Sequence, residues 1–147
     1  MNNYFNERNL HSVDSKGRIL LPKDIRDHHK LKKGEVLVCV PVVVNPAYVE
    51  IRTDAQWKRY RDGLRGTEPG ASKKDSFRMA DLSKDSATLD GQGRVLIPQW
   101  IRELCKIGDT VAIVDMDEYI ELWAKEHIEQ KYQEMLRAFK ERNDKLF

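Results

Sequence analysis

The strongest constraint on the fold is a phrase that the chain contains twice. VDSKGRILLP at residues 13–22 and LDGQGRVLIP at residues 89–98 align at an offset of 76 (90 − 14), and seven of the fourteen positions from residue 13 to 26 are identical. After a two-residue slip, Gly34 aligns with Gly108, and an apolar run follows each glycine. The chain therefore carries an internal duplication of a unit of roughly 30 residues, and two copies are too few for a solenoid.

Each copy has the same local pattern, which starts with D-x-x-G. Asp14 and Asp90 suit the first position of a tight turn, and Gly17 and Gly93 suit the fourth, where φ can be positive. A strand follows each turn, and a proline then begins a short helix. The pattern predicts strands at 17–21, 36–40, 93–97 and 111–114, and helices at 23–31 and 99–107.

The rest of the chain surrounds these two copies. Alternation predicts strands at 47–53 and 119–123, Asp54 can cap a helix at 55–65, and apolar residues recur at helical spacing after residue 124. Residues 66–75, GTEPGASKKD, have the composition of a flexible linker. We therefore expect a first unit with its following helix at 1–65, a linker at 66–76, and a second unit with an amphipathic C-terminal helix at 77–147.

Composition limits the class of protein less than the distribution of charge does. The net charge of the 147 residues is only +2, but residues 1–34 hold eight basic and four acidic groups, whereas residues 109–130 hold seven acids and one lysine. This asymmetry favours one face for an anionic partner, although scattered solvated charges would also explain it. Cys39 and Cys105 lie in apolar surroundings, which indicates reduced, buried thiols. No stretch approaches the length of a membrane span.

The two phrases resemble the paired D-x-x-G-R signatures of the bacterial MraZ family, whose units are SpoVT-AbrB domains. Phe5 and His11 before the first phrase, and IELW after the second, extend the resemblance over nearly the whole chain. It implies an α+β fold of two tandem AbrB-like swapped-hairpin β-barrel units with short helices and a C-terminal helix. Glu7, where glycine is usual, Asn9, where an aromatic is common, and the VVV run at 42–44 depart from the family pattern.

The resemblance also implies a function. Members assemble into closed rings and act as transcriptional regulators on repeated boxes upstream of their own operon, at the head of the division and cell wall gene cluster. The expected partners are double-stranded promoter DNA and further copies of the chain, and the expected location is the cytoplasm, in association with the nucleoid. No membrane partner, small-molecule substrate or cofactor is expected.

The residues that could contact DNA gather around the two turns. An arginine directly after a rigid turn can grip a phosphate or the guanine edge through two donors, and lysine or glutamine in the turn can reach phosphate or adenine. A structural role, in which Arg18 and Arg94 pair with Asp14 and Asp90, explains the local pattern about as well. The predicted DNA-binding residues are Lys16, Arg18, Gln92, Arg94, Arg8, Lys23, Arg26 and Arg102, with the last two assigned to phosphate, and the turn-forming residues are Asp14, Gly17, Asp90 and Gly93.

Other functions receive less support. An AbrB-type antitoxin-like module, which binds DNA and a partner protein, is the alternative, but two copies and a patterned helix argue against it. No nucleophile, phosphate-loop or paired-carboxylate pattern indicates an enzyme. His28 and His29 are adjacent without a third ligand nearby in the sequence, so we expect solvated side chains and no metal site.

Overall fold

A computed structural model describes residues 5–65 and 71–142 of the chain. The strands are β1 (Leu10–Ser12), β2 (Arg18–Leu20), β3 (Val36–Val42), β4 (Tyr48–Arg52), β5 (Asp85–Leu89), β6 (Arg94–Leu96), β7 (Thr110–Asp115) and β8 (Ile120–Ala124). The helices are the 3-10 turn η1 (Glu7–Asn9), α1 (Lys23–His28), α2 (Asp54–Arg65), α3 (Ala71–Ser83), α4 (Gln99–Leu104) and α5 (Lys125–Arg142). The first copy of the repeat contributes β1 to β4 with α1, and the second contributes β5 to β8 with α4.

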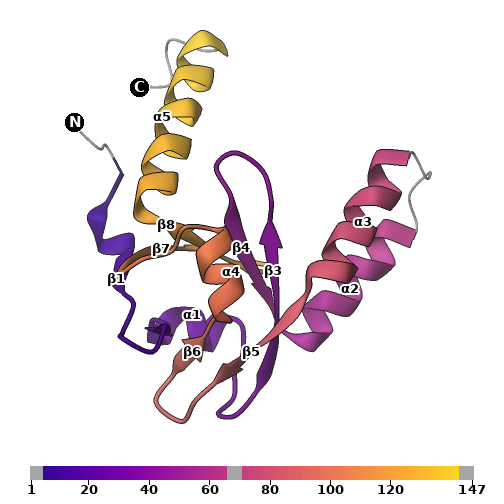
Figure 1. Ribbon diagram of the computed structural model, residues 1–147, viewed down its shortest axis with the longest axis vertical. Coiled ribbons are helices and arrows are strands. Elements are labelled where there is room, and N and C mark those ends of the chain that lie inside the picture. The colour runs from indigo at the N-terminus through magenta and orange to yellow at the C-terminus, as the bar shows by residue number, and fades with distance from the viewer. Residues whose placement is uncertain (1–4, 66–70, 143–147) are drawn as a thin grey trace.

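The eight strands form one antiparallel sheet that curls into a nearly closed barrel (Figure 1). Their order is β1-β7-β8-β4-β3-β5-β6-β2, and a bridge between Val13 and Ile19 joins the two edge strands. Each copy lends strands to the other, because β1 pairs with β7 and β3 pairs with β5. The α+β class and the swapped, AbrB-like arrangement are confirmed, and the strands of both copies share a single barrel.

A local two-fold axis relates the two copies. In the β2–β6 pair, Ile19 lies opposite its own equivalent Val95. In the β4–β8 pair, Glu50 lies opposite its equivalent Glu121. Because a residue faces its counterpart in both pairs, the axis passes through β2–β6 and through β4–β8, on opposite sides of the barrel.

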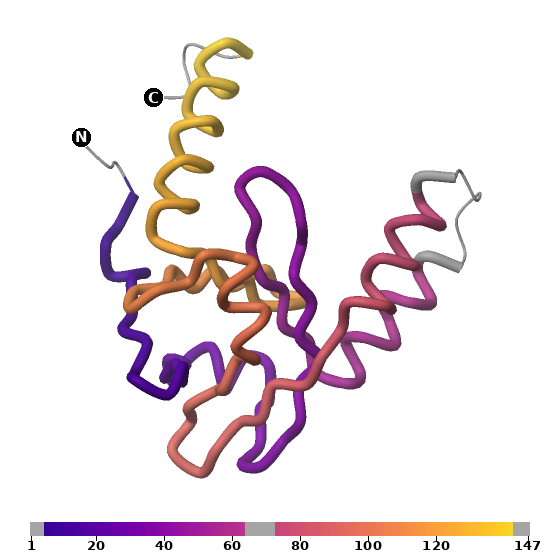
Figure 2. The backbone as a smooth tube through the Cα atoms, viewed as in Figure 1, coloured from indigo at the N-terminus to yellow at the C-terminus, as the bar shows by residue number. Residues whose placement is uncertain are grey.

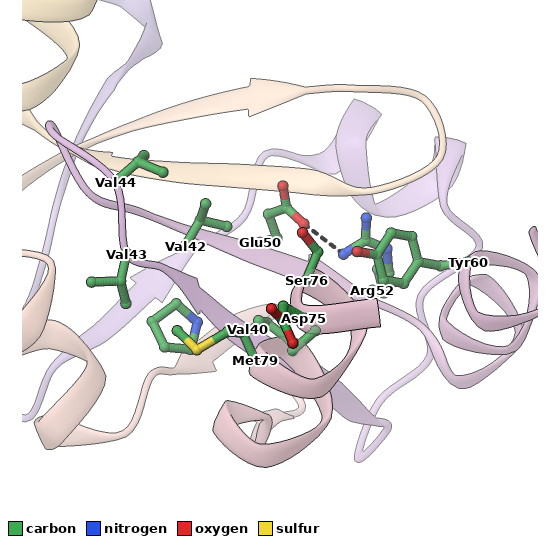
Figure 3. Close-up of a pocket in the computed structure, with 12 residues that line it drawn as sticks. Val40, Val42, Val43, Val44, Glu50, Arg52, Tyr60, Asp75, Ser76 and Met79 are labelled. Atoms are coloured by element: carbon green, nitrogen blue, oxygen red, sulfur yellow. Dashed lines mark hydrogen bonds and ion pairs between the residues drawn. The ribbon is translucent and has the colours of Figure 1, made fainter. Parts of the chain in front are cut away.

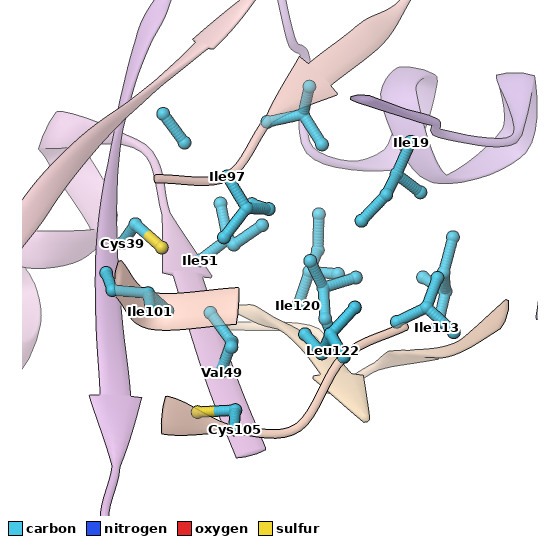
Figure 4. Packing of buried hydrophobic residues seen from close by; sticks show 14 of the residues in the cluster. Ile19, Cys39, Val49, Ile51, Ile97, Ile101, Cys105, Ile113, Ile120 and Leu122 are labelled. Atoms are coloured by element: carbon cyan, nitrogen blue, oxygen red, sulfur yellow. The ribbon is translucent and has the colours of Figure 1, made fainter. Parts of the chain in front are cut away.

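The barrel interior is filled by aliphatic side chains from both copies (Figure 4). Successive side chains of a strand point to opposite faces of the sheet. In the strands after the two turns, buried residues therefore alternate with more exposed ones, and Ile19, Val95 and Ile97 have no exposed area. Cys39 and Cys105 are buried, unpaired thiols, as expected, and burial raises the pKa of both.

The longer helices lie away from the β5–β6 turn. The α2–α3 pair and α5 lie on either side of the projecting β3–β4 hairpin (Figure 2). The strands and helices predicted from the repeat are present, but residues 71–76 of the expected linker belong to α3, and residues 66–70 lie outside the described residues. None of the described helices is both long and apolar enough to cross a membrane.

Candidate nucleic-acid interface

The two D-x-x-G turns have the same backbone geometry. Asp14 Oδ1 accepts hydrogen bonds from the backbone N–H groups of Lys16 (2.9 Å) and Arg18 (2.8 Å). Asp90 Oδ1 accepts the equivalent bonds from Gln92 and Arg94, both at 2.9 Å. An aspartate that accepts hydrogen bonds from backbone groups two and four residues ahead ties the two ends of the turn together.

Each aspartate also holds the arginine that follows its turn. Arg18 Nε donates to Asp14 Oδ2 at 2.7 Å, and Arg94 Nε donates to Asp90 Oδ2 at 2.8 Å. The backbone hydrogen bond from Arg94, followed by the bonds from Gln92 and from the guanidinium, lowers the pKa of Asp90 to about 2, and the pKa of Asp14 is lowered in the same way. These ion pairs agree with the structural role that the sequence left open for the arginines.

The pairing fixes the guanidinium groups without covering them. The side chains of Arg18 and Arg94 keep 28% and 31% of their accessible area. Each ion pair engages Nε, and a guanidinium carries two further nitrogens that can donate as a fork to phosphate or guanine. A pre-oriented arginine loses less side-chain entropy on binding than a free one.

The outward side chains of β2 and β6, Arg18, Leu20, Arg94 and Leu96, form what we name the ribbon face. Arg18 lies opposite Leu96 and Leu20 opposite Arg94, so the two arginines occupy one diagonal of the face and the two leucines the other. Both leucines are exposed, at 54% and 44%. The repeat places these four residues on two predicted strands, but no local pattern indicates that β2 pairs with β6.

Arg26 and Arg102, for which a phosphate contact is predicted, pack against the two turns. Their Nε atoms donate to the carbonyls of Leu21 and Ile97, both at 3.0 Å. The Arg102 guanidinium packs on Gly17 and that of Arg26 packs on Gly93, so each arginine supports the turn of the opposite copy. A DNA contact by these two residues stays a prediction, and their observed contacts serve to hold the turns.

The remaining predicted residues lie in the two turns, in α1 and in η1. Lys16 and Gln92 are exposed in the two turns, directly beside the arginines. Lys23 is exposed in the first turn of α1 and pairs with Asp27 at 3.2 Å. Arg8 is exposed in η1, at the opposite end of β1 from the turn, so the structure does not bring it into the group around the turns.

The structure brings His28 and His29 together with Asp115, a grouping that sequence reasoning missed. His28 Nδ1 and His29 Nε2 lie 2.7 and 2.9 Å from the Asp115 carboxylate, and His28 Nε2 lies 2.9 Å from Asp117. The prediction of two solvated side chains is wrong for His29, which is buried. The signal was absent locally because Asp115 follows the pair by more than eighty residues.

These three residues could hold a metal ion by their spacing, but the ring nitrogens that face Asp115 are placed to donate hydrogen bonds to its carboxylate. Gln56 Oε1 accepts from the Thr53 N–H at 3.0 Å, so the Gln56 amide nitrogen donates to His29 Nδ1 at 2.8 Å. His29 then carries its proton on Nε2, facing Asp115, where a metal would need a lone pair. The cluster therefore acts as a hydrogen-bonded clamp between α1 and the β7–β8 turn.

Comparison with known proteins agrees with this architecture. The sequence profile of the family described as "MraZ protein, putative antitoxin-like" matches residues 4–76 and 82–147, which include both turns. The chain belongs to the MraZ family. Within the described residues, the two matched segments correspond to the two interlocked copies of the barrel, so the MraZ resemblance seen in the repeated phrase is confirmed.

Curated MraZ relatives cover most of the chain. A protein of Caldanaerobacter subterraneus is 32% identical over 119 residues, which is 79% of this chain and 78% of the relative. A protein of Finegoldia magna is 32% identical over 136 residues, 88% of this chain and 84% of the relative. One from Bacteroides thetaiotaomicron is 27% identical over 122 residues, 82% and 78% of the two chains. All three relatives are named transcriptional regulator MraZ.

Proposed function

We propose that this chain is a sequence-specific DNA-binding transcriptional regulator and that the ribbon face contacts DNA. The observation that carries the proposal is the pair of pre-oriented arginines, Arg18 and Arg94, placed symmetrically on a two-stranded ribbon. A two-stranded β-ribbon fits the major groove, where arginine reads guanine and exposed aliphatic groups contact thymine methyls. The names of the MraZ relatives support a role in transcription.

The proposed target is a set of repeated boxes upstream of the chain's own operon, at the head of the division and cell wall gene cluster. One protomer offers two arginines and two turn residues, which is a small contact with DNA. An oligomer that places several ribbon faces on several boxes gains affinity through effective concentration without any new contact. The protein then acts in the cytoplasm, at the nucleoid.

The proposed oligomer is a closed ring, and exposed apolar residues beside the β3–β4 hairpin support self-association. Val43, Val44 and Met79 are 53%, 56% and 55% exposed. They line an open groove of about 570 Å³ between the hairpin and α3, which we name the hairpin groove (Figure 3). The Glu50–Arg52 ion pair, 2.8 Å long, also lines it. Exposed apolar residues that gather in one groove are typical of a protein–protein interface.

The test is a titration of the protein into labelled DNA from upstream of its own gene, followed by fluorescence anisotropy. Shuffled DNA of the same composition is the control, at ~150 mM salt, where non-specific phosphate binding is weak. We expect tight binding to the upstream DNA alone. Equal, weak and salt-sensitive binding to both DNAs would overturn the proposal.

Two variants assign the binding to the ribbon face. Arg18→Ala with Arg94→Ala is expected to abolish specific binding. Arg18→Lys with Arg94→Lys keeps a cation beside each aspartate but loses the fork, so it is expected to retain salt-sensitive binding while losing preference for the upstream DNA. Circular dichroism checks that both variants are folded. Specific binding that survives in the folded alanine variant would place the DNA contact elsewhere.

A further inference from the structure

The ribbon face is symmetric in shape but not in the chemistry at its two ends. The local two-fold axis passes between Ile19 and Val95 beneath the face and exchanges Arg18 with Arg94 and Leu20 with Leu96. The same operation exchanges the two turns, which have the same hydrogen bonds from their aspartates. The side chains in the turns differ, since one turn reads Asp-Ser-Lys-Gly and the other Asp-Gly-Gln-Gly.

The difference lies in side chains that are available for a ligand. Among the described residues, neither the Lys16 ammonium nor the Gln92 side-chain amide has a hydrogen bond or an ion pair. Both leave the backbone at equivalent points of equivalent turns. Lysine donates to guanine or to phosphate, whereas glutamine pairs with adenine through a donor and an acceptor.

A second aligned pair also has lysine in the first copy and glutamine in the second, but these two residues lie at the opposite ends of the ribbon face. Lys23 in α1 and Gln99 in α4 are equivalent, but each is engaged by an acid four residues later, Lys23 with Asp27 at 3.2 Å and Gln99 with Glu103 at 2.9 Å. Because Arg26 of α1 packs on Gly93, helix α1 lies beside the second turn. Each end of the face thus has one lysine and one glutamine, and only the turn residues are unengaged.

A two-fold protein surface selects a two-fold, palindromic DNA site, as symmetric dimers do. Here the symmetric arginines and leucines set two equivalent half-sites, and the turns make them unequal. We propose that Lys16 and Gln92 break the palindrome, so that one protomer reads an asymmetric DNA element with guanine favoured beside Lys16 and adenine beside Gln92. This inference rests on the proposed DNA-binding function and names the residues that give its site a direction.

The experiment makes the two turns identical in the full-length protein. Ser15→Gly with Lys16→Gln gives two Asp-Gly-Gln-Gly turns, and Gly91→Ser with Gln92→Lys gives two Asp-Ser-Lys-Gly turns. A side chain at Gly91 meets nothing within 4 Å and Gly91 lacks a positive φ, so the second variant fits the turn. Each protein selects its preferred sequences from a duplex library with a randomised central segment, and the selected sequences are compared.

We expect the natural chain to select a non-palindromic element and each symmetrised variant to select a palindrome built from one half of it. Exchange of the favoured base should change affinity at least about fivefold in anisotropy titrations. Lys58→Gln is the matched control, since it removes an exposed lysine of α2, away from the ribbon face and the turns, and it should leave the selected element unchanged.

The outcomes separate this inference from the function beneath it. A natural chain that enriches no sequence overturns the proposed function and the inference together. A natural chain that enriches an asymmetric element which both symmetrised variants also select overturns the inference alone. A palindrome selected by the natural chain does the same.

Discussion

At the scale of single residues, Gly17 and Gly93 meet two requirements at once. Their φ angles are +86° and +85°, and a methyl group on either would overlap the guanidinium of Arg102 or Arg26. We expect Gly17→Ala and Gly93→Ala each to lower the free energy of unfolding by more than about 1 kcal/mol, measured by urea denaturation. Gly91→Ala, in the same turn but in open space, should change it by less than about 0.5 kcal/mol. Equal effects at Gly91 and Gly93 would contradict this reading.

The ionisation of Asp90 makes the stability of the fold depend on pH. The backbone hydrogen bond from Arg94 is the largest cause that lowers the pKa of Asp90 to about 2 in the folded chain, from an ordinary value of 3.8. A lowered pKa stabilises the fold above the ordinary value, and that contribution is lost as the pH falls from about 4 to about 2. We expect the melting temperature of Asp90→Asn to fall less than that of the natural chain over this window, in scanning calorimetry.

Asp27→Asn is the control for acid titration in general, because Asp27 is exposed in α1 and takes no part in either turn. Its melting temperature should follow that of the natural chain. If Asp90→Asn and the natural chain lose stability in parallel, the carboxylate does not fix the turn.

At the scale of elements, the clamp between α1 and the β7–β8 turn has no counterpart in the other copy. Leu104 and Cys105 occupy the aligned positions of His28 and His29. Hydrogen bonding and charge from Asp115, supported by Asp117, raise the pKa of His28 above its ordinary 6.5. Burial opposes ionisation of Asp115, but hydrogen bonds from His28, the Asp117 backbone and His29 bring its pKa down to about 2.

A raised pKa of this kind gives a testable pH dependence. The contribution of His28 to stability is fully present below pH 6.5 and is lost as the pH rises through the raised value in the folded chain. We expect the natural chain to lose stability from about pH 6.5 upward more steeply than His28→Leu, which copies the aligned residue of the other half. Chemical denaturation at a series of pH values measures this, and parallel curves for the two proteins would exclude the clamp.

Elements could be predicted from the sequence where their signal is local. The D-x-x-G turns, the strands that follow them and α5 depend on neighbouring residues, and the structure has them. Helix α3 was missed because GTEPGASKKD contains two glycines and a proline before the helix, and the apolar residues of α3 are few. The β2–β6 pair, the packing of Arg26 on Gly93 and the approach of Asp115 to His29 join distant positions, so no local pattern could reveal them.

At the scale of the whole molecule, the ribbon face and the hairpin groove belong to different parts of the surface. The ribbon face consists of β2 and β6 beside the turns, and the groove lies between the β3–β4 hairpin and α3. The proposed DNA contact and the proposed self-association can therefore be changed separately. This separation allows the gain from oligomerisation to be measured on a protein whose contacts with each box are intact.

We expect Val43→Lys with Val44→Lys to lower the molar mass measured by light scattering, because two charges would have to be desolvated in the groove. Affinity for DNA with one box should stay unchanged, whereas affinity for DNA with several boxes should fall by about 100-fold or more. Leu104→Lys is the matched control, because Leu104 is 42% exposed in α4, outside the groove. An unchanged molar mass in the hairpin variant would place the contact between protomers on another surface, and an equal loss on both DNAs would show that the hairpin contacts DNA directly.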